Sequence, residues 1–193
     1  MRRTILLLAT MALTLLVASG IALAVTKIGT AGPDVLRGTN SHDQLAGRGG
    51  PDALSGLGAG DCLLGGNGPD SLNGGPGNDI VLGGGAGCNA IGRVQEGPAA
   101  SDVVRGGPGD DILWGAAGAD DISGGRGDDE LGDGEAHRGA IDTLSGGSGD
   151  DFFIPFNDPA GKDVVSCGGG HDEVFADGAD VVSGDCEKVH RDD

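Results

Sequence analysis

Apolar residues follow two different patterns along this chain. Residues 5–24 are almost wholly apolar and follow a short positive region, Arg2 and Arg3. From Gly29 onward, short apolar segments recur every ninth residue and are separated by segments rich in glycine and aspartate. This pattern predicts a leader segment followed by many short strands that are joined by tight turns.

The nine-residue period begins at Gly29 and is interrupted three times. Units such as GGNGPDSLN, GGPGNDIVL and GGSGDDFFI repeat in one register. The chain therefore divides into a leader (1–24), a first repeat block (25–91), an interruption (92–96), a second block (97–132), an interruption (133–136), a third block (137–154), an interruption (155–157) and degenerate C-terminal repeats with a cap (158–193).

Two positions of the unit are almost invariant. Position eight is apolar in every unit, from Leu36 to Val182. Position six is aspartate in every unit except the one that carries Cys88 there. The aspartates are Asp34, Asp43, Asp52, Asp61, Asp70, Asp79, Asp102, Asp111, Asp120, Asp129, Asp142, Asp151, Asp163, Asp172 and Asp180. A disordered low-complexity chain has no reason to keep two positions in phase, so the pattern indicates an ordered repeat.

The unit has a direct physical interpretation. Glycine at positions one, two and four suits a tight turn with positive φ, and positions seven to nine form a short strand whose position-eight side chain points inward. Two units make one coil of 18 residues, and coils that stack about 4.8 Å apart form a rod roughly 35 Å long. The predicted fold is all-β, a parallel β-roll (β-solenoid) of nonapeptide repeats, after an N-terminal signal helix. Trp114, at position nine, is expected to point outward as an exposed aromatic residue.

The charge of the chain restricts its partners. It has 30 acidic and 12 basic residues and a formal net charge of −18, which argues against nucleic-acid binding. Stacking places the position-six aspartates in two columns, one along each edge, where neighbouring carboxylates repel. The columns therefore need cations. Carboxylate and turn-carbonyl oxygens favour calcium over zinc or copper, so Ca²⁺ is the expected cofactor.

The repeat resembles the RTX (hemolysin-type calcium-binding) repeat family, whose nonapeptide is GGxGxDxUx. The units at 65–73, 74–82, 106–114 and 146–154 match every fixed position. The resemblance implies a β-roll that folds on calcium, with turn carbonyls and the fifteen position-six aspartates as ligands. The best sites are expected at Asp52, Asp70, Asp79, Asp111, Asp129 and Asp151. Units with fewer glycines, such as GTNSHDQLA and HRGAIDTLS, are expected to form weak or empty sites.

The N-terminal segment indicates the compartment. Ala22-Leu23-Ala24 places small residues at the two positions that a signal peptidase reads, so cleavage is expected before Val25. A retained membrane anchor is the competing interpretation, because the apolar run approaches spanning length. With the leader removed, no membrane span is expected, and the protein is predicted to be secreted, either extracellular or at the cell surface.

Four cysteines in a secreted chain predict two disulfides, with three pairings open. Cys167 and Cys186 lie about one coil apart, which favours this pair and would clamp the C-terminal end. Cys62–Cys88 ranks second: about three units separate them, which would place them on opposite sides of a regular roll, but Cys88 lies in a degenerate unit beside an interruption.

The chain contains no HExxH, GxSxG or GxxxxGK[ST] motif. The hypothesis is a secreted calcium-binding repeat protein without enzymatic activity, a structural or adhesive module with a cell-surface or secreted protein partner. The alternative is the calcium-binding accessory portion of a secreted enzyme or toxin system. A third hypothesis, a cation-independent adhesive or ice-binding solenoid, leaves the aspartate columns unexplained.

Overall fold

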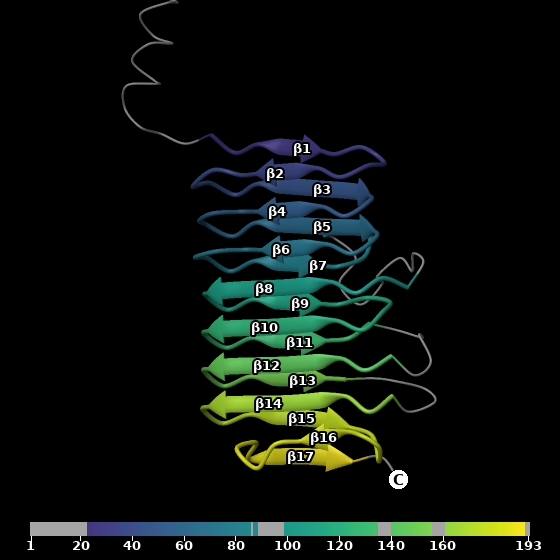
Figure 1. Ribbon diagram of the computed structural model, residues 1–193. Helices are drawn as coiled ribbons and strands as arrows, with labels where there is room; N and C mark the ends of the chain where they lie inside the picture. The colour runs from purple at the N-terminus through teal and green to yellow at the C-terminus, as the bar shows by residue number, and fades with distance from the viewer. Residues whose placement is uncertain (1–22, 86, 89–98, 135–139, 156–160, 192–193) are drawn as a thin grey trace, which may run out of the picture.

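The computed structural model describes residues 23–193 apart from 86, 89–98, 135–139, 156–160 and 192–193. The predicted leader helix lies in residues outside this range. The described part is all-β: strands wind into a stack of coils, and successive strands alternate between two sheets (Figure 1). No helix in the described residues is long and apolar enough to cross a membrane.

Each sheet collects every second strand of the chain. The nine-stranded sheet contains β1 (Thr26–Ile28), β3 (Gln44–Gly49), β5 (Cys62–Asn67), β7 (Ile80–Leu82), β9 (Ile112–Trp114), β11 (Glu130–Gly132), β13 (Phe152–Ile154), β15 (Glu173–Ala176) and β17 (Lys188–Arg191). The eight-stranded sheet contains β2 (Val35–Arg37), β4 (Ala53–Ser55), β6 (Ser71–Asn73), β8 (Val103–Pro108), β10 (Asp121–Arg126), β12 (Thr143–Ser148), β14 (Val164–Gly169) and β16 (Val181–Val182). Neighbouring strands are parallel, which confirms the predicted parallel β-roll.

The core consists of one row of apolar side chains from each sheet. Position-eight residues pair with one another across neighbouring strands, as in Leu45↔Leu63 and Leu63↔Val81. From Leu45 to Val174 the position-eight side chains of the strands are at most 2% exposed. Lys27 takes this position in the first coil, where it pairs with Leu45 and its Nζ donates to the Arg37 carbonyl. A charged side chain therefore covers the N-terminal end of the core.

Glycine serves two different purposes in the turns. Positions two and four have positive φ, for example 114° at Gly66 and 116° at Gly68. Position one does not, which corrects the expectation that it shares this role. A Cβ on Gly47 would lie 2.2 Å from Oδ2 of Asp52 and 2.6 Å from the Gly65 carbonyl oxygen. In most units position one is glycine because the aspartate of the same unit approaches too closely for a side chain; Asp133 and Cys167 are exceptions.

The first interruption is longer than the sequence indicates. β6 pairs directly with β8 and β7 with β9, so the unit predicted at 83–91 places no strand between them. Instead Gly83 serves as position one for Asp102, whose Oδ2 would lie 2.5 Å from a Cβ there. This is the unit in which Cys88 replaces the position-six aspartate. The last strand before each of the three interruptions, β7, β11 or β13, belongs to the nine-stranded sheet.

Both predicted disulfides are present, Cys62–Cys88 and Cys167–Cys186. Cys62 lies at position seven and so on the outer face of the nine-stranded sheet, and Cys88 lies in the unit that places no strand in either sheet. The expectation that Cys62 and Cys88 lie on opposite sides assumed that both units take part in the regular roll. It therefore does not apply to Cys88. Cys167 is fully buried, and its partner packs against the core.

Trp114 corrects a second expectation. It lies on the outer face of the nine-stranded sheet, yet it is only 9% exposed. Its ring lies over Gly132 of the next strand, where a Cβ would come within 2.4 Å of the ring. The indole therefore packs along the stack and is not an exposed aromatic residue.

Candidate metal centre

The position-six aspartates form two buried columns inside the roll. Column A precedes the strands of the eight-stranded sheet and consists of Asp34, Asp52, Asp70, Asp102, Asp120, Asp142, Asp163 and Asp180. Column B precedes strands of the nine-stranded sheet and consists of Asp43, Asp61, Asp79, Asp111, Asp129, Asp151 and Asp172. All are at most 6% exposed except Asp34, which is half-buried at the N-terminal end. The alternation of the strand explains the burial, because positions six, eight and one all face inward.

One oxygen of each carboxylate links neighbouring coils. Within each column, the backbone N–H of one aspartate donates to Oδ1 of the aspartate in the next coil, over distances of 2.6–3.1 Å. The sequence separation is 18 residues in six of these thirteen bonds, and across interruptions it is larger, for example 32 from Asp70 to Asp102 and 22 from Asp120 to Asp142. The columns therefore run unbroken past the interruptions.

The other oxygen is left without a hydrogen bond in most units. Oδ2 is buried and unpartnered in Asp52, Asp61, Asp70, Asp79, Asp111, Asp120, Asp129, Asp151 and Asp172. This set includes all six aspartates that the sequence favours as the best sites. A buried carboxylate oxygen without a partner is unfavourable, so each one needs a proton or a cation.

Turn carbonyls lie beside these oxygens. A Cβ on Gly56 would lie 2.2 Å from Oδ2 of Asp61 and 2.6 Å from the Gly74 carbonyl oxygen, and Gly65 has Asp70 Oδ2 and the Gly83 carbonyl both at 2.4 Å. At these two glycines, and likewise at Gly47 and Gly146, the carboxylate oxygen and the carbonyl oxygen therefore lie on the side where the glycine has no side chain. The donors are hard oxygens, which is the ligand type that calcium prefers. The residues present therefore fit a calcium ion.

Burial governs the electrostatics of the columns. Desolvation raises the pKa of Asp79 to about 7, opposed by the hydrogen bond from the Asp61 backbone and reinforced by the charges of Asp111 and Asp61. In the same way burial raises the pKa of Asp70 to about 6 and that of Asp102 to about 7. The pKa values of Asp120, Asp129 and Asp142 are also raised to about 7, with desolvation as the largest cause. Without a cation, the folded stack therefore favours protonated carboxyl groups.

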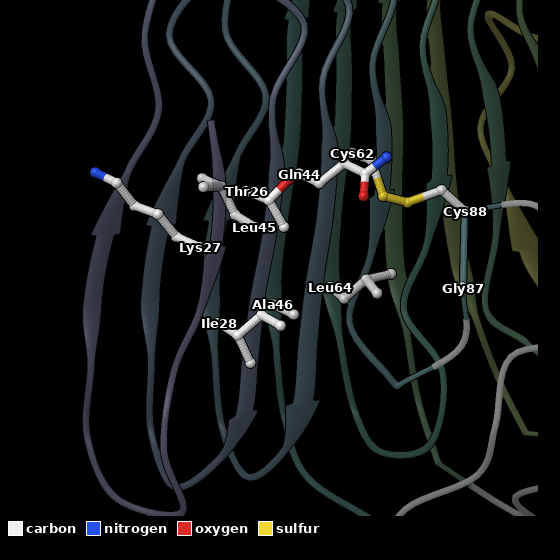
Figure 2. A pocket seen from close by; sticks show the side chains of 10 residues that line it. All are labelled: Thr26, Lys27, Ile28, Gln44, Leu45, Ala46, Cys62, Leu64, Gly87 and Cys88. Atoms are coloured by element: carbon white, nitrogen blue, oxygen red, sulfur yellow. A yellow bond between two sulfur atoms is a disulfide. The ribbon is translucent and has the colours of Figure 1, made fainter. Parts of the chain in front are cut away.

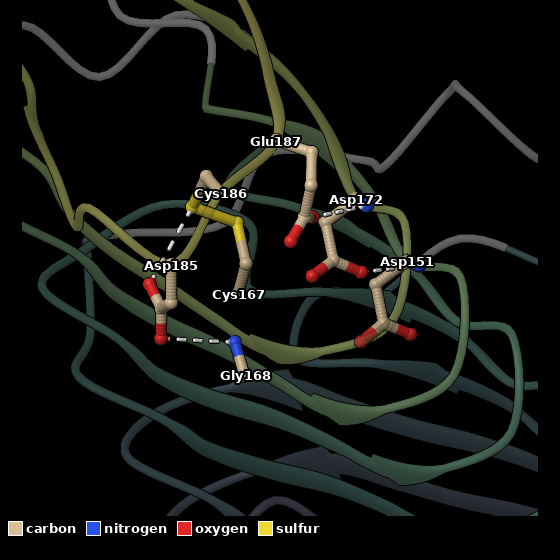
Figure 3. The surroundings of a disulfide bond; sticks show 7 residues. All are labelled: Asp151, Cys167, Gly168, Asp172, Asp185, Cys186 and Glu187. Atoms are coloured by element: carbon tan, nitrogen blue, oxygen red, sulfur yellow. Dashed lines mark hydrogen bonds between the residues drawn. A yellow bond between two sulfur atoms is a disulfide. The ribbon is translucent and has the colours of Figure 1, made fainter.

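The repeat pattern did not identify two acidic residues that join the columns. Glu187 ends column B, because its Oε2 accepts the backbone N–H of Asp172 at 2.9 Å (Figure 3). Glu187 and Val189 keep the two-residue spacing of positions six and eight. This spacing is the sequence feature from which Glu187 could have been predicted. Asp133 follows β11 directly and occupies position one. It lies buried with Asp142 and Asp163, and one carboxylate oxygen from each lies within 4.8 Å of the others.

A second acidic row runs along the outside of the turns that lead into column B. The backbone N–H of Asp128 donates to Asp110 at 3.0 Å, Asp150 donates to Asp128 at 2.8 Å, and His171 donates to Asp150 at 2.9 Å. All four side chains are exposed. The first members of the aspartate doublets therefore face solvent and are separate from the buried columns.

An apolar pocket of about 220 Å³ lies on the outer face of the roll near its N-terminal end (Figure 2). Ile28, Ala46 and Leu64 contribute to its lining from successive strands, and Gly87 with the Cys62–Cys88 disulfide borders it. Among the described residues that line the pocket, Lys27 alone is ionisable.

The chain also matches a known repeat. Four copies of the RTX calcium-binding nonapeptide repeat match residues 28–54, 55–86, 99–131 and 139–154, which together are more than half of the chain. The chain belongs to the RTX repeat family. No curated protein matches it. Twelve of the fifteen column aspartates of this RTX protein lie within the matched residues, and the matched repeat is a calcium-binding one.

Proposed function

We propose that this RTX protein is a secreted β-roll that folds on calcium and acts as a non-catalytic structural or adhesive module. One observation carries the proposal: a row of aspartate Oδ2 atoms is buried without hydrogen-bond partners. At several position-one glycines, a turn carbonyl oxygen lies beside the Oδ2 atom, where the glycine has no side chain. The two disulfides fit an oxidising compartment.

Calcium would act on folding through the columns. The position-six aspartates and the neighbouring turn carbonyls would hold the ions, and a bound ion supplies positive charge where stacking crowds carboxylates. Oδ1 of each aspartate holds the backbone of the preceding coil, so the chain already positions the other oxygen when the coils stack. Because ions bind the stacked coils and not the extended chain, binding stabilises the fold.

Far-UV circular dichroism of the chain, titrated with calcium and then with chelator, tests calcium-coupled folding. At pH 8, where the column carboxyl groups are ionised, the expected result is a β signal that develops with calcium and is lost in chelator, with magnesium as the control ion. A β signal that is complete in chelator contradicts the proposal.

Two substitutions make the test specific to the columns. Asp79→Asn keeps an oxygen for the Asp61 N–H but removes the charge, and the matched control Asp128→Asn alters an exposed aspartate. We expect the calcium-dependent gain in melting temperature to shrink for Asp79→Asn and to stay unchanged for Asp128→Asn. Equal effects would show that general surface acidity, and not the columns, binds calcium.

The alternative role, the calcium-binding portion of a secreted enzyme or toxin system, predicts a catalytic partner protein. Purification from the secreting organism in calcium distinguishes the two roles. Recovery with an enzyme or toxin subunit favours the accessory role, whereas recovery with surface material or as a free rod favours the structural one.

A further inference from the structure

Val25 occupies the place of a column aspartate in the first coil. Its backbone nitrogen lies 2.6 Å from Oδ1 of Asp43, 18 residues later, and its carbonyl accepts the N–H of Gln44 at 2.9 Å. These are the same two bonds that each aspartate makes with the following coil. Val25 is therefore at position six of a coil that has no aspartate, and its nitrogen is the first donor of column B.

A signal peptidase is expected to cleave the peptide bond between Ala24 and this nitrogen. Small residues precede Val25 at positions 22 and 24. Leu23 is 61% exposed and Ala24 is also exposed, and Thr39 Oγ1 donates a 3.3 Å hydrogen bond to the Leu23 carbonyl. Removal of these residues leaves β1 and its pairing with β3 intact.

We propose that cleavage of the Ala24–Val25 bond is a maturation step that places the new α-ammonium group of Val25 on the carboxylate of Asp43 and so caps column B with a positive charge. Water supplies a hydroxyl to the Ala24 carbonyl carbon and a proton to the Val25 nitrogen. The released carboxylic acid then loses a proton, and the amine gains one. A neutral amide donor becomes a cationic donor at the same position.

The surroundings of Asp43 explain why the charge matters there. Asp43 is 2% exposed and begins a column of seven aspartates, so its interaction with a cation is weakly screened. Its other oxygen accepts the N–H and hydroxyl of Thr39. Charge-assisted hydrogen bonds are roughly twice as strong as neutral ones. Asp34, the first residue of column A, is half-buried and bonded to Thr30, so the chain start caps column B alone.

The inference relies on the secretion part of the proposed function but not on calcium-coupled folding. The mass of the protein secreted with its own leader gives the N-terminus, which is expected to be Val25. Chains that start at Val25, at Ala24, or at N-acetylated Val25 are then unfolded in denaturant at neutral pH in saturating calcium. The acetylated form keeps the N–H and lacks the charge.

The chain with a free Val25 amine is expected to have a roughly fivefold smaller unfolding equilibrium constant than the other two. In an Asp43→Asn background this difference should disappear, whereas in the matched Asp34→Asn background it should persist. Cleavage at another bond, or equal stability of all three chains with Asp43 present, would overturn the inference. Neither outcome depends on the circular dichroism test of calcium-coupled folding, so the two proposals can fail separately.

Discussion

At the scale of single residues, the close contact between position-one glycine and position-six aspartate defines the columns. Gly74 is the clearest case, since a Cβ there would lie 2.2 Å from Oδ2 and 2.8 Å from Cβ of Asp79. The glycine leaves one face of the carboxylate free of side chains. The same glycine is therefore required both by the packing of the fold and by the access of an ion to Oδ2.

Gly74→Ala is expected to lower the stability of the calcium-loaded protein by about 1–3 kcal/mol, because overpacking displaces Asp79. The control is Gly32→Ala, where a Cβ would meet no atom within 4 Å, and it should change stability by less than about 0.5 kcal/mol. Thermal unfolding at fixed calcium measures both. Equal melting temperatures for the two variants would contradict the contact.

The sequence predicted the columns because each position kept its phase over the whole array. It could not predict which oxygen is bonded or how deeply the carboxylates lie, because both depend on the coil stacked next to each unit. It also misplaced 83–91, because the glycines there keep the repeat spacing although Cys88 replaces the aspartate and β6 pairs directly with β8. Glu187 was missed because its spacing from Asp172 is 15 residues, not 18.

At the scale of elements, the last coil depends on additional contacts. Cys167 occupies position one, which is Gly146 in the preceding unit of column B. Its disulfide joins it to Cys186, which lies between β16 and β17 (Figure 3). Asp185 accepts the N–H of Gly168 at 3.2 Å, and Glu173 contacts Lys188 and His190 on β17. These contacts replace the repeat at the end where its period is lost.

Cys167→Ala/Cys186→Ala is therefore expected to destabilise the protein by about 2–4 kcal/mol, because it frees a loop of 19 residues in the unfolded chain. Hydrogen exchange should rise first in β15 and β17. The matched pair Cys62→Ala/Cys88→Ala should leave exchange in these strands unchanged, since Cys62 lies on β5, which is separated from β15 by four strands of the same sheet. Faster exchange across the whole roll in both variants would show that neither disulfide acts locally.

At the scale of the whole molecule, the columns turn the roll into one electrostatic unit. Fourteen column aspartates are nearly inaccessible to water, and each hydrogen-bonds its neighbour through the backbone, so a change of charge at one unit is felt by the next. Protons and calcium are two ways of neutralising the same oxygens. The stability of the roll should therefore depend on both together.

In chelator, the melting temperature is expected to fall as the pH rises from about 4 to about 7. The pKa of Asp79 is about 7 in the folded protein against an ordinary value of 3.8, because burial disfavours the charged form. A carboxyl group whose folded pKa is raised contributes its stability fully below the unfolded value, and this contribution is lost as the pH rises through the folded value. Calcium favours the ionised form, so in saturating calcium the melting temperature should stay level or rise over the same interval. Differential scanning calorimetry between pH 4 and pH 8, with and without calcium, measures this. A metal-free melting temperature that increases with pH would show that the buried columns do not control the stability of the roll.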